Sequence, residues 1–183
     1  MIEEFTINAF SENHIGLLNR ITIIFTRRHV NIESLTVSAS AIKGIHKFTI
    51  VVNSTEDQVK KIVRQIEKHV EVIRAFFYRN DEIIHQEVAL YKVPTEALTG
   101  STKIESIIRK HNAKILEVTR KYTVIEKTGH KEETEALFYE LDQFNVLQFN
   151  RSGRISITKA DVELLSDYLD EIDQIHYQNY KSN

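Results

Sequence analysis

Hydrophobic residues in the first half of the chain alternate between two periods, one typical of strands and one typical of helices. Residues 5–10, 33–40 and 46–52 alternate apolar and mostly polar side chains, which predicts three strands. Between the first two segments, hydrophobic side chains recur at the spacing of an amphipathic helix. They are Leu17, Leu18, Ile21, Ile24 and Phe25.

A second helix is predicted after the third strand. Thr55 and Gln58 have the spacing of a capping box at a helix start. Residues 72–78 predict a fourth strand, so the expected order is βαββαβ. The stripe of the second helix consists of Val59, Ile62, Val63, Ile66 and Val70.

The second half of the chain repeats this order. Ser101 or Thr102 can cap its first helix, and Gly129 marks a turn. The expected elements are a strand at 87–93, a helix carrying Ile104, Ile107 and Ile108, strands at 115–118 and 122–125, a helix at 133–141 and a strand at 146–149.

Two βαββαβ units predict an α+β protein with two ferredoxin-like domains, residues 1–80 and 81–159. Each domain should form an antiparallel sheet with both helices on one face. Residues 160–183 predict an amphipathic helix with an acidic outer face. Its apolar stripe consists of Val162, Leu165, Leu169 and Ile172.

Composition narrows the function classes. Lys and Arg number 24 against 26 Asp and Glu, so no basic field favours nucleic acid or anionic lipid. The chain has no cysteine, which removes disulfides and thiol chemistry and suits a reducing compartment. The acidic start Met1–Glu4 is unlike a signal peptide, and no apolar run is long enough for a bilayer. We therefore expect a cytoplasmic protein without membrane contact.

Enzymatic signatures are missing from the sequence. The eight histidines are scattered, without the spacing of a metal site, and no nucleophile elbow, P-loop or dinucleotide fingerprint occurs. Acidic pairs such as Glu132–Glu133 fall on a predicted helix surface, where solvation is the default. We predict no catalytic residue and no metal site.

The turn between the first strand and the first helix carries the most information. Residues 12–20 follow an extended apolar run and open an amphipathic helix, and residues 30–35 begin the next strand. Such a turn presents free backbone N–H groups at a helix N-terminus. These groups suit a small anion such as an amino-acid carboxylate.

These stretches resemble a known family. The first unit is similar to the N-terminal ACT domain of acetohydroxyacid synthase (acetolactate synthase) small regulatory subunits, and the second to the C-terminal domain of that family. The similarity covers roughly residues 2–159, and its most specific part is the heptad Asn31–Val37. It is carried by Glu12–Asn13, Gly16, Leu18, Arg20, Asn31–Val37, Ile115–Thr119, Thr128–Gly129 and Arg151–Arg154.

The resemblance implies a regulatory, non-catalytic chain. It would activate a catalytic large subunit and confer feedback inhibition by a branched-chain amino acid, with valine expected first and leucine or isoleucine open. Thiamine diphosphate, Mg²⁺ and FAD are expected in the large subunit, and no cofactor in this chain. The effector would lie between the ACT domains of two chains, which implies a homodimer. The acidic tail would pack on its own domain, which its stripe favours, or dock on the large subunit.

The effector contacts follow from the motif, and the chemistry of the residues agrees with it. The Gly16 to Leu18 backbone can bind the carboxylate at the positive end of the helix, and Gly16 has no Cβ to obstruct it. An Asn carbonyl can accept from the ammonium, and apolar side chains can contact the branched group. The candidates are Asn13, Gly16, Leu17, Leu18, Asn31 and Ile32.

Each candidate also has a purely structural interpretation. Asn13 can be a turn or cap residue, Asn31 a left-handed helix cap, and Leu18 or Ile32 a core residue. Only their joint occurrence in the family spacing favours a ligand site. His14 departs from the family pattern; it is either exposed or a source of pH dependence at the effector. The second unit has Thr95–Gly100 where the turn would be, so we expect the effector in the first unit only.

Two other functions fit parts of the pattern. The chain could be an ACT-type amino-acid sensor that regulates a different enzyme. An RNA-recognition module shares the βαββαβ order, and residues 43–50 begin like its RNA-binding motif. The stacking positions, however, hold Ile45, Lys47 and Ile50 where aromatic rings are needed.

Overall fold

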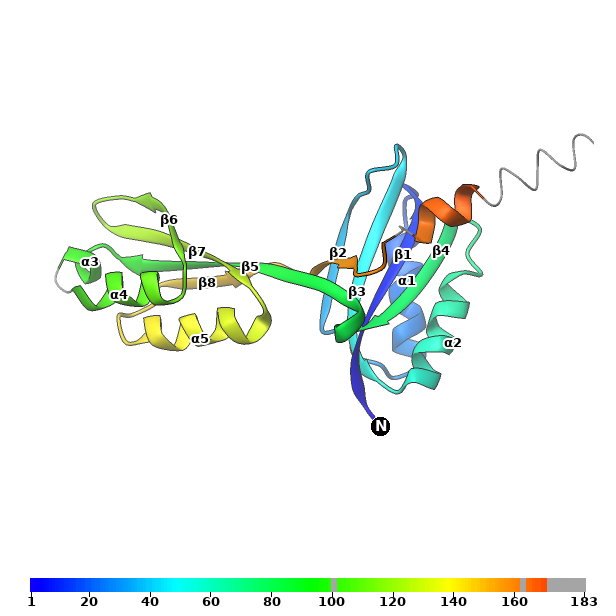
Figure 1. The fold of residues 1–183 in the computed structure, drawn as a ribbon, viewed down its shortest axis with the longest axis horizontal. Helices are drawn as coiled ribbons and strands as arrows, with labels where there is room; N and C mark the ends of the chain where they lie inside the picture. The colour runs from blue at the N-terminus through cyan, green and yellow to red at the C-terminus, as the bar shows by residue number, and fades with distance from the viewer. Residues whose placement is uncertain (100–101, 162–163, 171–183) are drawn as a thin grey trace, which may run out of the picture. The chain divides into compact units, whose positions relative to one another are not determined.

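In the computed structural model, residues 1–99, 102–161 and 164–170 are described. They form two compact units (Figure 1). The first unit contains Met1–Ile84 and the described residues from Ser156 onward, and the second contains His85–Ile155. Among the described residues, no helix has the length and apolar character needed to cross a membrane.

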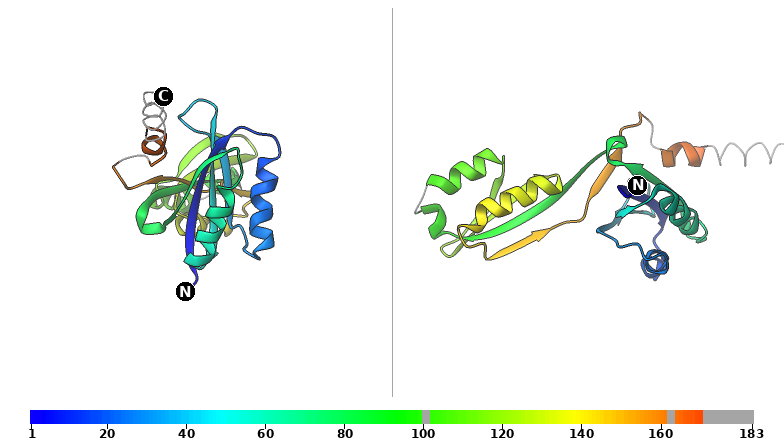
Figure 2. Two further views of the ribbon diagram at one scale, coloured as in Figure 1. Left: turned by 90° about the vertical axis from the view of Figure 1, so that its right-hand side faces the viewer. Right: turned by 90° about the horizontal axis from the view of Figure 1, so that it is seen from below.

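The first unit has the predicted βαββαβ order. Its sheet has the strand order β2-β3-β1-β4 with antiparallel neighbours, and α1 and α2 lie side by side on one face (Figures 1 and 2). This is the ferredoxin-like arrangement. The elements are β1 (Glu3–Glu12), α1 (Leu17–Arg27), β2 (Ser34–Ala39), β3 (Ile45–Ser54), α2 (Glu56–Ile66) and β4 (Val72–Arg79).

Alternate residues of the strands build the core beneath the helices. Phe5, Ile7 and Ala9 of β1 pack with Ile21 and other stripe residues of α1 and α2. Because side chains alternate across a strand, the intervening residues lie on the opposite face of the sheet. These include the buried polar residues Thr6, Asn8 and Thr49.

The α2 helix begins where the sequence predicts. The Thr55 hydroxyl accepts a hydrogen bond from the backbone N–H of Gln58 at 3.4 Å. The Gln58 side chain does not complete the capping box. Its amide oxygen instead accepts from the Ser54 hydroxyl at 2.8 Å, and its amide N–H₂ donates to the Arg28 carbonyl.

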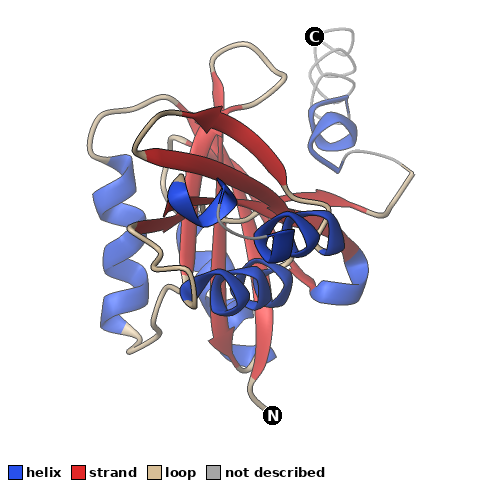
Figure 3. Cartoon of the chain, turned by 90° about the vertical axis from the view of Figure 1, so that its left-hand side faces the viewer, coloured by secondary structure: helices blue, strands red, loops and turns tan. Residues whose placement is uncertain are grey.

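The second unit repeats the same topology. Its sheet has the order β6-β7-β5-β8, and α4 and α5 lie side by side (Figure 3). Its core centres on Ala89, Tyr91 and Val93 of β5. The elements are β5 (Ile83–Pro94), α3 (Glu96–Thr99), α4 (Thr102–Lys110), β6 (Lys114–Val118), β7 (Tyr122–Gly129), α5 (Lys131–Asp142) and β8 (Gln148–Arg151), with a 3₁₀ turn, η1 (Asn80–Glu82), before β5.

The chain after β8 differs most from the expectation. A strand that the pattern does not predict, β9 (Ile155–Thr158), pairs with β5. From Ser156 onward the chain belongs to the first unit, whereas the sequence assigns residues up to 159 to the second domain. Four alternating residues contain no information about which sheet they join, so the pattern cannot place them.

The predicted tail helix is present over residues 164–170. Leu165 of its stripe is buried, with 1% of its surface exposed. Two other stripe residues, Val162 and Ile172, lie outside the described residues, as does the cap predicted at Ser101.

Candidate ligand-binding site

The turn between β1 and α1 ends at a glycine whose conformation suits no other residue well. Gly16 has φ 83°, in the left-handed region, and a Cβ placed there would have no atom within 4 Å. Glycine is therefore required by the backbone and not by crowding. The open space around the missing Cβ leaves room for a ligand at this turn.

The first turn of α1 has unsatisfied donors. The Leu17 N–H donates to the His14 carbonyl at 3.3 Å, and the Arg20 N–H donates to the Gly16 carbonyl at 3.2 Å. The N–H groups of Leu18 and Asn19 have no hydrogen-bond partner among the described residues. No side chain of the described residues caps α1, and the first turn of α1 carries no acidic residue.

The α2 helix begins in a different way. Thr55 caps it, and Glu56 and Asp57 stand in its first turn. An acidic first turn already supplies negative charge to the positive end of the helix dipole. The start of α1 therefore remains open to an external anion, and the start of α2 does not.

The side chains of the sequence candidates divide into two groups. Leu17 is 1% exposed and belongs to the core, so only its backbone lies at the turn. Leu18 is 45% exposed and presents an apolar side chain beside the free N–H groups. Asn13 is exposed and forms no side-chain hydrogen bond with the described residues.

The other candidates lie at the far end of α1. The Asn31 amide N–H₂ donates to the Glu33 carboxylate at 3.1 Å, and Ile32 packs at the edge of the core. Asn31 is not the left-handed cap, because His29 takes that conformation with φ 53°. The eleven residues of α1 span about 16 Å at 1.5 Å per residue. One chain therefore does not bring Gly16 and Asn31 to a common ligand.

Glu71, a residue that the sequence analysis did not identify, supports the turn. The Arg20 guanidinium donates to the Glu71 carboxylate at 2.7 Å, and the Glu71 carbonyl accepts from the Glu12 N–H at 2.9 Å. The hydrogen bond from Arg20 lowers the pKa of Glu71. His14 is largely exposed, and its Nδ1 lies 3.9 Å from the same carboxylate.

The second unit offers no equivalent turn in its described part. The Thr95 hydroxyl donates to the Thr119 carbonyl at 2.9 Å, and the Thr95 N–H donates to the Lys121 carbonyl. The hydroxyl and N–H groups of Thr95 are therefore both used in hydrogen bonds within the second unit.

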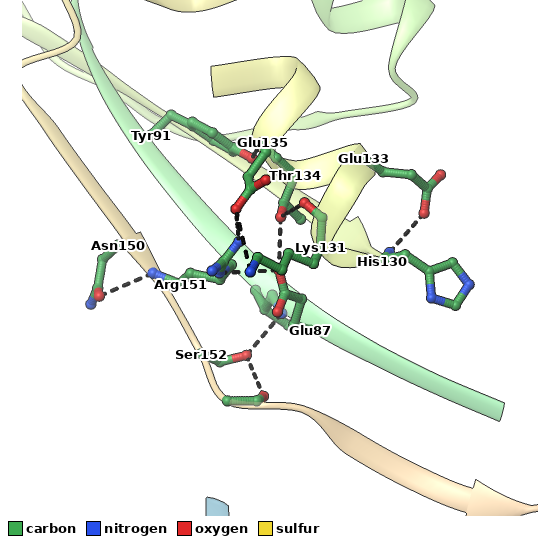
Figure 4. A network of polar contacts seen from close by, with 12 residues as sticks. Glu87, Tyr91, His130, Lys131, Glu133, Thr134, Glu135, Asn150, Arg151 and Ser152 are labelled. Atoms are coloured by element: carbon green, nitrogen blue, oxygen red, sulfur yellow. Dashed lines mark hydrogen bonds and ion pairs between the residues drawn. The ribbon is translucent and has the colours of Figure 1, made fainter. Parts of the chain in front are cut away.

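A polar network in the second unit has a structural explanation (Figure 4). The Arg151 guanidinium lies 3.2 Å from Glu87 and 3.1 Å from Glu135. The Thr134 hydroxyl lies 2.7 Å from Glu87, and the Tyr91 hydroxyl donates to the Thr134 carbonyl at 2.6 Å. Burial raises the pKa of Tyr91. The network links the start of α5 to β5 and β8, so Arg151 has a structural role in the second unit.

No metal centre is formed by the described residues, since no three His, Asp or Glu side chains gather at a suitable distance.

Comparisons with known proteins agree with this architecture. The family described as the small subunit of acetolactate synthase matches residues 86–160, and the AHAS small subunit-like ACT domain matches residues 7–74. The acetolactate synthase small subunit of Bacillus subtilis (strain 168) is 34% identical over 149 residues, covering 81% of this chain and 86% of that protein. The Mycobacterium leprae (strain TN) small subunit is 33% identical over 155 residues, covering 85% and 91%.

A solved structure is similar over most of the chain. The crystal structure of the acetolactate synthase small subunit from Thermotoga maritima matches with a TM-score of 0.79 and 27% identity. The match covers 88% of this chain and 100% of that one. The chain therefore belongs to the family of acetolactate synthase small subunits, the regulatory subunits built on an ACT domain.

Proposed function

We propose that this chain binds a branched-chain amino acid at the β1–α1 turn and thereby controls a catalytic large subunit of acetolactate synthase. The observation that carries the proposal is the uncapped start of α1. There the left-handed Gly16 leaves the Leu18 and Asn19 N–H groups without partners among the described residues. Convergent N–H groups at the positive end of a helix bind a carboxylate.

The aliphatic and ammonium groups of the ligand would be bound by side chains at the two ends of α1. The half-exposed Leu18 and the partly buried Ile32 would contact a branched aliphatic group. The amide oxygens of Asn13 and Asn31 would accept from the ammonium. Valine is the expected effector. Leucine and isoleucine differ from it by one methylene, worth about 1–3 kcal/mol in an apolar pocket.

The complete site would need two chains. Because α1 separates Gly16 from Asn31, the turn of one chain would meet Asn31 and Ile32 of a second copy. The edge strand β2 supports such a homodimer. Among the described strands it pairs with β3 alone, and its Val37 side chain is 41% exposed. An uncovered edge strand with apolar side chains favours pairing with another chain.

The catalysis would reside in the partner. The relatives are named as small subunits, and the thiamine diphosphate, Mg²⁺ and FAD would be held by the large subunit, with none in this chain. Effector binding would shift the dimer toward one geometry and change the activity of the partner. By linkage, the partner would change the effector affinity by the same factor. We place the complex in the cytoplasm.

Calorimetric titration of the full chain with valine, leucine and isoleucine tests the proposal. We expect heat with at least one of them and none with Gly16→Asp, because the new carboxylate would occupy the anion position. Gly44→Asp is the matched control. Gly44 has φ 84° and, like Gly16, no atom within 4 Å of the position that a Cβ would occupy, but it lies between β2 and β3.

Light scattering must show a dimer in the same buffer. No heat from the dimeric wild-type chain with any of the three amino acids would refute the effector. Equal loss of binding in both glycine variants would refute the assignment to the turn.

A further inference from the structure

A cavity of about 230 Å³ lies on the opposite face of the first sheet from α1 and α2. Its floor consists of outward-facing residues of β1, β3 and β4, and the segment after β9 covers it. Leu165 of that segment lines the cavity and is 1% exposed. The Arg74 guanidinium lies 5.0 Å above the Tyr168 ring, which further seats the segment on the sheet. Figures 1 and 2 show the segment in orange beside the first sheet.

Apolar and polar side chains both line the cavity. Phe10 and Phe76 meet edge to face, with ring centroids 6.3 Å apart, and Leu165 closes the opposite side. An apolar cavity of about 150 Å³ is enough to bind benzene. This cavity therefore has room for one ring or branched chain together with a small polar group.

Two polar side chains in the floor, those of Asn8 and Lys47, carry hydrogen-bond donors. Asn8 is 3% exposed, and its amide oxygen accepts from the Ser156 hydroxyl at 3.3 Å. Its amide N–H₂ has no hydrogen-bond partner among the described residues. The Lys47 ammonium also lines the cavity; it donates to the Ser156 carbonyl at 2.6 Å and lies 5.8 Å from the centre of the Phe10 ring.

We propose that this cavity is a second ligand site, which binds a small monocarboxylate bearing an aromatic or branched apolar group. Asn8 lines the cavity, and its amide N–H₂ could donate a hydrogen bond to a carboxylate oxygen of the ligand. The Lys47 ammonium adds the positive charge. Asp161 lines the same cavity and is exposed, so a second negative charge on the ligand would be repelled.

This site is separate from the β1–α1 turn. Asn8 and Lys47 face away from the helices, whereas Gly16 begins one of them. The proposal does not depend on the amino-acid effector, and Gly16→Asp should leave it intact. A bound carboxylate would contact both the sheet and the covering segment, and so would hold residues 164–170 in place.

The probe for the test is phenylacetate, added to the full chain and followed in ¹H–¹⁵N spectra. We expect the side-chain amide signal of Asn8 to move, with saturation. Phenylacetamide, which lacks the charge, and succinate, which carries two, should bind at least tenfold more weakly. Lys47→Met should weaken phenylacetate binding at least tenfold. Lys47→Arg should largely retain it, and Lys43→Met, at an exposed turn residue, is the matched control.

A fluorescent reporter gives an independent reading. The chain has no tryptophan, so Phe76→Trp would place the only indole in the cavity wall. Its emission should change with phenylacetate, and that of Tyr139→Trp, at an exposed position of α5, should not. No shift at Asn8, or equal binding by wild type and Lys47→Met, would overturn the proposal. Loss of phenylacetate binding in Gly16→Asp would instead assign the ligand to the turn and would equally overturn it.

Discussion

The Arg20 guanidinium and the Glu71 carboxylate are joined at 2.7 Å, although 51 residues separate them in the chain. This ion pair connects the first turn of α1 with the residue before β4. The Glu71 carbonyl also accepts from the Glu12 N–H, so Glu71 is bonded to both ends of the turn on which the proposed function depends.

Glu71→Gln should make the stability of the chain less sensitive to acid. The hydrogen bond from Arg20 lowers the pKa of Glu71 in the folded state. A pKa that is lower in the folded state stabilises the fold at every pH above the pKa of the same group in the unfolded chain. This stabilisation is lost as the pH falls through the folded-state pKa. Urea unfolding at pH 6 and pH 3 should show a smaller decrease for Glu71→Gln than for wild type. Glu132→Gln, on the exposed start of α5, is the control. An identical decrease in Glu71→Gln and wild type would contradict the prediction.

Gly16→Ala and Gly44→Ala should destabilise the chain to a similar extent. Both glycines have positive φ, and neither added methyl group would meet an atom within 4 Å. The cost is therefore conformational, about 1–2 kcal/mol for an alanine in the left-handed region. Thermal unfolding of the two variants measures it. A neutral effect at either position would show that the local backbone can change conformation freely.

Leu17→Ala should reduce the stability of the chain, whereas Leu18→Ala should reduce its affinity for the effector. Leu17→Ala removes a fully buried side chain and should cost about 2–5 kcal/mol of the free energy of unfolding. Leu18→Ala removes a half-exposed side chain, so we expect little change in stability and a weaker calorimetric affinity for the effector. If Leu18→Ala destabilised the chain as much as Leu17→Ala, its assignment to the site would be wrong.

Arg151→Met should destabilise the second unit by about 2 kcal/mol, the size of a hydrogen bond to a charged group. It would leave the mostly buried Glu87 without its ion-pair partner. Hydrogen exchange at backbone amides of β5 and α5 measures the effect, with first-unit amides as the internal reference. Adding Glu87→Gln should recover part of the loss, because the mostly buried carboxylate would no longer be present, whereas Glu135 is partly exposed to solvent. A larger loss in the double variant would mean that Glu87 is not the partner that matters.

Much of the fold follows from local periodicity. The alternating and three-to-four spacings predict both βαββαβ units because the central strands β1, β3 and β5 and the helices α1 and α2 each bury at least one face. The Thr55 cap and the Gly16 turn are likewise local signals. The starts and ends of strands are harder to predict. The β1 strand extends two residues beyond the predicted alternation at each end, and β3 extends one residue at its start and two at its end. There the pairing with the neighbouring strand continues although most of the added side chains are polar.

Contacts between distant segments could not be predicted in this way. Nothing near Arg20 in the sequence indicates Glu71, and nothing near Asn8 indicates Ser156, 148 residues away. His29, and not Asn31, takes the left-handed position after α1, although Asn is the better residue for it. The Gly16 turn could be proposed as a site from sequence, but the sequence does not indicate that the Leu17 N–H is already bound to the His14 carbonyl or that the Asn19 N–H is open.

The path of β9 has a practical consequence for dissecting this protein. The second unit is inserted into the first, because the chain leaves at Ile84 and returns at Ser156. A fragment that ends at Ile84 would keep all four strands of the first sheet and lose the segment over its outer face. Asn8 and the aromatic rings beside it would then be exposed to solvent. The full chain, or a version that splices Ile84 to Ser156 through a short linker, is the appropriate unit for biochemical work on the first domain.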